Sequence, residues 1–134
     1  MKKTKAKKTA CSIDRATAYA LAVVNGEIMA GPYVRGACQR HLNDLKYAGE
    51  RGFYYAEAEA AKAIRFFEEY LCLNGGQFEG KPFILLPWQC FIVGSIFGWK
   101  RDTSDKWLER RPDGDVRDTR HKRRFRVAFI ETAK

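Results

Sequence analysis

Apolar residues recur at helical spacing along most of the chain, separated by short breaks that contain glycine, asparagine or proline. This pattern predicts a first helix from about Ile13 to Val24. Ser12 or Asp14 can cap its free backbone N–H groups, and Asn25-Gly26 supplies the turn that ends it.

A second helix is predicted to open at Gly31-Pro32, because proline fits the first turn of a helix, where its missing N–H costs no hydrogen bond. An apolar stripe predicts the face that packs on the core, and Ala48-Gly49 marks the end of the helix. The stripe consists of Val34, Cys38, Leu42 and Leu45, with Ala37 and His41 beside it.

A third helix is predicted from about Ala56 to Leu73, after the aromatic pair Phe53-Tyr54 and before the closing turn Asn74-Gly75-Gly76. Two consecutive amphipathic helices with short links favour an antiparallel helical pair packed on something larger. The apolar stripe of this helix consists of Ala60, Ile64, Phe67 and Leu71.

The pattern then changes to short, strongly apolar runs. An extended segment, Phe83 to Leu86, leads into Pro87-Trp88-Gln89, which opens a fourth helix through Phe97. Because this helix is apolar on nearly every side, we expect it to be buried.

A polar loop over residues 100–118 follows, and Arg123 to Thr132 then alternates as a strand does. The backbone groups of a strand need partner strands. We therefore expect this strand to pair with chain that follows Lys134 or with a second polypeptide. The predicted fold class is an α/β fragment, with about four helices followed by a strand.

Composition is typical of one globular domain: of 134 residues, 46% are hydrophobic and 31% charged. No apolar stretch reaches the ~18 residues of a membrane span, so we expect no membrane partner. The basic start and the apolar residues after Ala16 differ from a signal peptide, because Asp14 and Arg15 stand directly between them. With four cysteines and no CxxC pair, the sequence predicts a cytoplasmic protein with reduced thiols.

The net charge of +9 indicates a polyanionic partner such as nucleic acid or nucleotide phosphate. We expect residues 1–10, which are rich in lysine, to form a disordered basic tail, and residues 11–134 to form a single unit. A second basic cluster is a candidate for phosphate contact, either with DNA or with the nucleotide of a neighbouring subunit. The alternative is a solvated loop whose charges offset nearby aspartates. The cluster consists of Arg120, Lys122, Arg123, Arg124 and Arg126.

A complete catalytic site is not evident in the sequence, and we assign no catalytic or metal-binding residue. Cys38 and His41 have the spacing of half a zinc site, but no second pair has suitable spacing. We therefore expect a core thiol beside a hydrogen-bonded histidine. No GxxxxGK[ST] phosphate loop is present either.

Three segments, in this order, resemble the N-terminal part of the ATPase domain in large terminase subunits of tailed bacteriophages. The resemblance covers about residues 16–134. The segments are AVVNGEIMAGPYVRGACQRHLNDL (Ala22 to Leu45), AIRFFEEYLCLNGGQFEGKPFILLPWQCFIVGSIFGWKR (Ala63 to Arg101) and RRFRVAFIETAK (Arg123 to Lys134).

The resemblance implies a P-loop ATPase that uses ATP and Mg²⁺ to package double-stranded DNA into procapsids, with a nuclease domain following it. Its partners would be the rest of the large subunit, the small terminase subunit and the portal protein. A glutamine in such a segment contacts adenine in this family, which implies that role for Gln89, with Pro87 beside it. Trp88 and Phe91 would then pack under or beside the base. A carboxamide suits adenine because it offers one donor and one acceptor. The alternatives are a helix cap for Gln89 and core packing for Trp88 and Phe91.

Lys134 matches the basic residue that opens the phosphate loop of the family, and Arg123 to Thr132 matches the strand before that loop, the first of the P-loop sheet. The Gly-Lys-Ser/Thr residues, the Walker B carboxylates and the nuclease aspartates are missing from these 134 residues, so we expect the isolated chain to be inactive. Two other classes of function stay open: a small basic helical protein that binds nucleic acid, and an inactive prophage relic.

Overall fold

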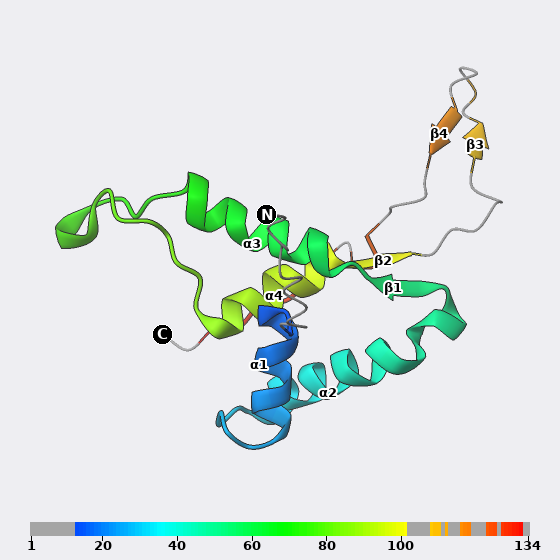
Figure 1. The fold of residues 1–134 in the computed structure, drawn as a ribbon, viewed down its shortest axis with the longest axis horizontal. Helices are drawn as coiled ribbons and strands as arrows, with labels where there is room; N and C mark the ends of the chain where they lie inside the picture. The colour runs from blue at the N-terminus through cyan, green and yellow to red at the C-terminus, as the bar shows by residue number, and fades with distance from the viewer. Residues whose placement is uncertain are drawn as a thin grey trace, which may run out of the picture.

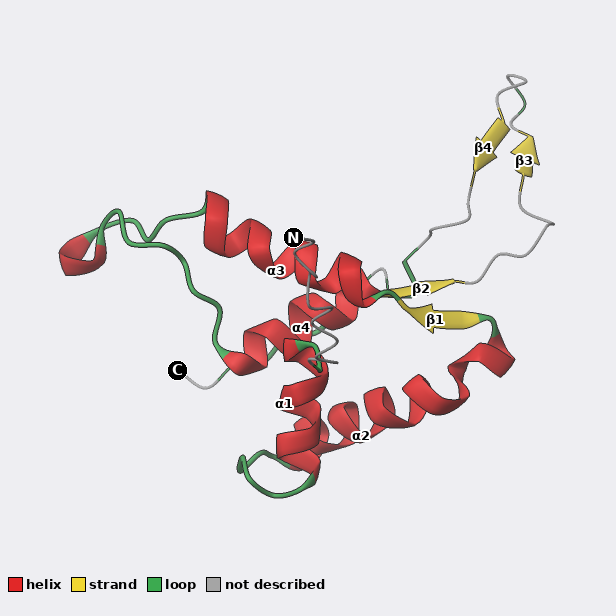
Figure 2. Cartoon of the chain, viewed as in Figure 1, coloured by secondary structure: helices red, strands yellow, loops and turns green. Residues whose placement is uncertain are grey.

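The structure, a computed structural model, describes residues 13–101, 108–110, 112, 116–118, 123–125 and 127–132. In these ranges the chain is mostly helical, with four α-helices and two small two-stranded antiparallel sheets (Figure 2). The prediction of about four helices is confirmed. The helices are α1 (Arg15–Val24), α2 (Pro32–Tyr47), α3 (Glu57–Tyr70) and α4 (Pro87–Gly98), and the 3-10 turns are η1 (Ala48–Arg51) and η2 (Gly76–Phe78).

The helix ends follow the capping chemistry of the sequence, with one exception. The Asp14 carboxylate caps α1 by accepting hydrogen bonds from the N–H groups of Ala16 and Thr17, at 3.0 and 3.2 Å. The turn after α1 is also as predicted, with Gly26 at a φ of +81°. The exception is α3, which ends before the predicted Leu73, because that residue donates its N–H to the carbonyl oxygen of Lys81 at 2.8 Å.

Helix α4 lies at the centre of the molecule and packs against both α1 and α3, while α2 packs on α1 (Figure 1). Two glycines allow this close approach: a methyl group on Gly94 would lie only 2.6 Å from the Cβ of Ala16, and Gly98 faces the ring of Tyr55. The prediction that α4 is buried on nearly every side holds only in part. The side chains of Trp88 and Phe97 keep 37% and 38% of their surface exposed.

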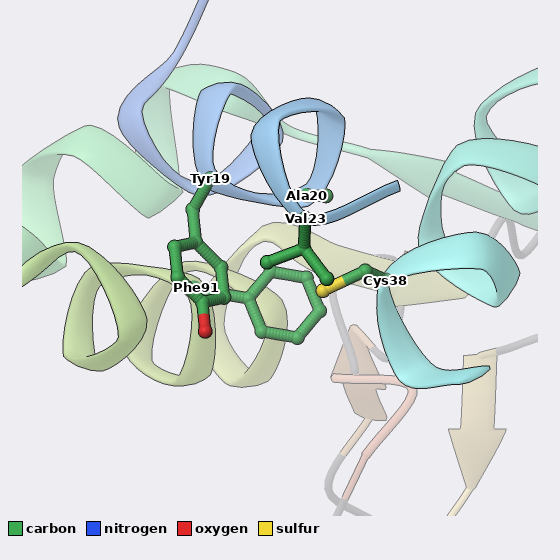
Figure 3. Close-up of a cluster of buried hydrophobic side chains, with 5 residues drawn as sticks. All are labelled: Tyr19, Ala20, Val23, Cys38 and Phe91. Atoms are coloured by element: carbon green, nitrogen blue, oxygen red, sulfur yellow. The ribbon is translucent and has the colours of Figure 1, made fainter. Parts of the chain in front are cut away.

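The core consists of two groups of buried side chains on either side of α4. Figure 3 shows the first group, in which residues from α1, α2 and α4 meet. It contains Tyr19, Ala20, Val23, Cys38 and Phe91, and the second group contains Ile64, Leu85 and Cys90.

The face of α2 that packs inward differs from the apolar stripe expected from the sequence. Val34 and Leu45 are each 41% exposed, whereas His41 and Asp44 are buried beside Cys38. The prediction of the buried face was partly wrong, because His41 and Asp44, which are polar but have hydrogen-bonding partners, take two of the buried positions.

A short ribbon joins the two halves of the chain. Strand β1 (Phe53–Tyr55) pairs with β2 (Trp99–Arg101) in antiparallel register, with Tyr54 opposite Lys100. A second pair, β3 (Leu108–Arg110) with β4 (Val116–Asp118), lies inside the predicted polar loop and extends away from the helices (Figure 1). The sequence patterns indicated neither pair, since three-residue strands are too short to show a period of two.

The strand predicted from Arg123 to Thr132 is not formed in the described residues. Only Arg123 pairs, in an isolated antiparallel bridge with Lys100, and the Arg124 N–H donates to the Trp99 carbonyl oxygen at 2.9 Å. Residues 127–132 are exposed and outside any strand, because no partner strand flanks them in the described part of the chain. The expected tail at residues 1–10 lies outside the described residues.

Candidate nucleotide-binding segment

The segment Pro87-Trp88-Gln89 forms the first turn of α4, after Leu86 as the N-cap residue. Leucine has no side-chain oxygen to accept from the N–H groups of the first turn. Gln89, at the third helical position, satisfies a different group: its Oε1 accepts a hydrogen bond from the backbone N–H of Leu86 at 2.8 Å, as the third helical residue does in a capping box. Gln89 therefore takes part in capping α4, as the helix-cap alternative proposed, through one hydrogen bond of its side chain.

The same carboxamide keeps further hydrogen-bonding capacity. A carbonyl oxygen has two lone pairs, of which the Leu86 N–H takes one, and the Nε2 group carries two N–H donors. Among the described residues, the hydrogen bond of the Gln89 side chain is made through Oε1 and none is made through Nε2. Gln89 is half-buried, and Pro87 and Trp88 beside it are exposed. Its edge can thus offer one acceptor and one donor to a planar base while the cap stays in place.

Phe91, one turn further along α4, is a core residue. Its ring lies 5.7 Å from the ring of Tyr19 and 5.6 Å from that of His41, measured between centroids, and it is 9% exposed. This agrees with core packing, so Phe91 is not available to stack under a base. Trp88 is the aromatic side chain of the segment that reaches the surface.

The predicted basic cluster divides into two environments where the structure describes it. Arg123 is exposed, and its guanidinium lies 5.2 Å from the ring centroid of Phe97. Arg124 is half-buried, and its Nη1 donates to Asp44 Oδ2 at 2.6 Å, with 13% of its side chain exposed. The remaining predicted site residues, Arg120, Lys122, Arg126 and Lys134, lie outside the described residues.

Arg124 belongs to a group of charged and aromatic side chains that we call the Asp44 clamp. The carboxylate of Asp44 accepts hydrogen bonds on both oxygens, from Arg124 and from Arg51. Burial alone would raise the pKa of Asp44, but the hydrogen bonds from the two arginines outweigh it, so its pKa lies below the usual value. The clamp consists of Asp44, Arg51, Arg124 and the rings of Phe53, Trp99 and Phe125.

Sequence reasoning did not find this clamp. Asp44 is not part of the apolar stripe predicted for the second helix, and its two partners follow it by 7 and 80 residues. A buried carboxylate needs partners, but the linear pattern does not show that Asp44 is buried.

His41 lies at the centre of a second buried network. The Trp99 indole N–H donates to His41 Nδ1 at 3.0 Å, and His41 Nε2 lies 3.0 Å from the Thr17 hydroxyl. An indole N–H is only a donor, so Nδ1 carries the lone pair and Nε2 donates its hydrogen to Thr17. Burial lowers the pKa of this histidine, which favours the neutral ring. The prediction of a hydrogen-bonded core histidine is confirmed.

The neighbouring thiol has the properties of a core group as well. Cys38 is fully buried, and burial raises its pKa to about 11, so the thiol stays protonated and unreactive at neutral pH. Across the described ranges, no group of three or more histidine, cysteine or carboxylate side chains is arranged to hold a metal ion.

Comparisons of the chain with protein-family models, with curated proteins and with solved structures found no match. Each helix in the part of the chain described here also falls short of the length and apolar character that crossing a bilayer requires. The site is therefore argued from its own residues and contacts.

Proposed function

We propose that this chain is the N-terminal part of the ATPase domain in a large terminase subunit of a tailed bacteriophage. In that role it contributes the adenine-binding segment of the motor that packages double-stranded viral DNA. The proposal rests on the three sequence segments that resemble this family in order. The observation that carries it is the exposed first turn of α4, in which Gln89 has a donor and an acceptor available for a base.

The direction of the C-terminal segment supports the same proposal. The bridge between Lys100 and Arg123 is antiparallel, so the chain after Arg123 runs opposite to β2 and back towards α4. In Figure 1 the red segment 127–132 passes behind α4 and emerges near the end that carries Pro87.

The lengths are compatible with this course. At full extension the six described residues 127–132 span about 20 Å, and the 12 residues of α4 are about 18 Å long. The segment can thus reach the level of Gln89. In a P-loop ATPase the strand before the phosphate loop ends beside the nucleotide. A segment that ends near Gln89 would fit this position.

The exposed side chains of the segment fit a strand that awaits its sheet. Val127 and Phe129 are 87% and 90% exposed, and Ile130 is 53% exposed. In the proposed domain, further strands would cover these side chains. ATP would be held at its base by Gln89, with Lys134 at the start of the phosphate loop. Mg²⁺ and the phosphates would be held by groups that this chain does not contain, so the isolated chain would be inactive.

The remaining parts of the proposal concern partners and place. Arg123 is the described member of the basic cluster that is available to a DNA phosphate, because Arg124 is bound to Asp44. The protein partners would be the rest of the large subunit, the small terminase subunit and the portal, in the cytoplasm of the bacterial host.

The main alternative is a small basic helical protein that binds nucleic acid non-specifically, which the net charge of +9 favours. The two functions predict different dependences of binding on salt and on the base of the nucleotide. A phosphate-binding protein loses affinity steeply as salt rises, whereas an adenine site distinguishes ATP from GTP.

The coding DNA that follows the codon of Lys134 tests the proposal directly. We expect the reading frame to continue, at once or after an insertion, into a Gly-Lys-Ser/Thr loop. A stop codon followed by unrelated genes would contradict the proposal and favour a relic.

A further inference from the structure

We propose that Arg124 is a positioning residue: through the Asp44 clamp it fixes the direction in which residues 127–132 leave the helices, and so aligns them with Gln89. The consequence for the nucleotide rests on the proposed function, whereas the effect on the direction of the segment does not.

The first argument is the number of elements that one guanidinium joins. Arg124 binds Asp44 of α2 and lies 4.6 Å from the ring centroid of Phe53 in β1 and 5.2 Å from that of Trp99 in β2. Its own N–H donates to the Trp99 carbonyl oxygen. The chain is therefore held at this point through both its side chain and its backbone.

The second argument is the contrast with the residues that follow. Phe125 is still held, with the guanidinium of Arg40 5.6 Å from its ring centroid. Beyond it, residues 127–132 are exposed, and within this range no hydrogen bond or ion pair ties them back to the helices. The direction of the segment is consequently set at residues 123–125.

The third argument is the type of residue. A planar guanidinium can donate to a carboxylate along its edge while its faces contact aromatic rings. A lysine can pair with Asp44 but has no flat face to stack. Arg51 donates to the other carboxylate oxygen of Asp44. Pairing with Asp44 alone therefore does not require arginine at position 124, whereas stacking on the rings does. The clamp is thus specific for arginine at position 124.

The test is a distance measurement between two spin labels on the full chain. Labels at Ile84→Cys, just before α4, and Val127→Cys, the exposed first residue of the segment, report the direction in which the segment leaves the helices. Cys11 and Cys72 are changed to serine, while Cys38 and Cys90 are buried and stay unlabelled.

We expect one narrow distance distribution in this parent protein. Arg124→Met should broaden it at least about twofold in width, and Arg124→Lys should give an intermediate width because it keeps the charge but not the stacking. Arg123→Met is the matched control, since Arg123 is exposed, and should leave the distribution narrow.

A merely structural role would change the melting temperature and not the direction of the segment in the folded protein. Ile64→Val removes one methyl group from the core at a distance from the clamp, and it should lower the melting temperature while the distribution stays narrow. If Arg124→Met does not fold, Arg124→Lys carries the test.

An unchanged narrow distribution in both Arg124 variants would overturn the inference, whatever follows Lys134 in the gene. A gene without a phosphate loop would overturn the proposed function instead, and the broadening by Arg124→Met would still be expected. The two failures are therefore distinguishable.

Discussion

His41 makes the stability of this protein depend on pH in a direction that its contacts determine. Its ring is neutral in the fold, because Nδ1 must accept from Trp99 while Nε2 donates to Thr17. Protonation of Nδ1 would break the first bond and place a charge in the core. Burial lowers the pKa of His41 below the 6.5 of the unfolded chain, so the unfolded state binds more protons between the two values.

We therefore predict that the free energy of unfolding decreases as the pH falls below about 6.5 and levels off below the folded pKa. Urea unfolding between pH 5 and pH 7.5 measures this. His41→Asn keeps the other histidine, His121, and should remove most of the dependence in this range. An equal pH dependence in the variant would contradict the assignment.

Asp44 is the second residue whose removal has a definite expected cost. Asp44→Ala leaves the guanidinium of Arg124 buried without its carboxylate, and we expect a loss of about 3 kcal/mol in unfolding free energy. This value is at the low end for a buried pair because Arg51 is 54% exposed and can turn to solvent.

The control for this prediction is the exposed pair between Arg15 and Glu68, 2.7 Å apart. Glu68→Gln should cost less than about 1 kcal/mol, since salt and water screen an exposed pair, and it leaves the hydrogen bond from Arg15 to the Leu85 carbonyl oxygen in place. Chemical unfolding of both variants under the same conditions makes the comparison. Similar losses would mean that the clamp is not a buried pair in solution.

At the scale of the elements, two glycines in helices should respond with opposite signs to the same substitution. A methyl group on Gly94 of α4 would meet the Cβ of Ala16 at 2.6 Å, so Gly94→Ala should destabilise the protein by about 1–3 kcal/mol. Gly36 of α2 has open space around it, and Gly36→Ala should stabilise by about 0.5–1 kcal/mol. Thermal unfolding of the two variants measures both signs, and a stabilised Gly94→Ala would contradict the central packing of α4.

How far the sequence predicts these elements depends on the length of each. Asp14, Gly26 and Pro32 act within one helical turn, so the ends of α1 and the start of α2 follow from local chemistry. Strands β1 and β2 are three residues long and lie far apart in the chain, so no local signal announces their pairing.

The candidate site divides in the same way. The first turn of α4, with Pro87 and Gln89, could be read from the sequence because its capping is local. The clamp could not, because Arg124 and Asp44 meet only after the helices and the ribbon have assembled. For the same reason a basic cluster in the sequence did not reveal that Arg124 faces inward while Arg123 faces solvent.

At the scale of the whole molecule, the different surroundings of Arg123 and Arg124 determine how each contributes to binding of a polyanion. The net charge of +9 predicts that the affinity for a DNA duplex falls as salt rises. We expect Arg123→Gln to reduce the slope of log affinity against log salt by about 0.9, the value for one lost phosphate contact. Arg124→Lys should leave the slope unchanged, because Arg124 pairs with Asp44. Fluorescence anisotropy over a salt series measures both slopes, and equal reductions would contradict the separate roles of the two arginines.

The central claim is that Gln89 reads adenine in an ATPase to which this chain contributes, and nucleotide preference tests it most directly. The ATPase is assembled from this chain and the polypeptide that carries the phosphate loop, and turnover of ATP is compared with that of GTP. Gln89→Ala removes both the oxygen that can accept from the N6 amino group of adenine and the N–H donor that can pair with adenine N7. The bond to N6 is the one that distinguishes the two bases, because guanine carries an acceptor, O6, at that position. Gln39→Ala, on the exposed face of α2, is the matched control. We predict that Gln89→Ala lowers the preference for ATP over GTP at least about tenfold, as expected for the loss of one well-placed hydrogen bond, while the control keeps it. An unchanged preference in Gln89→Ala would contradict the claim.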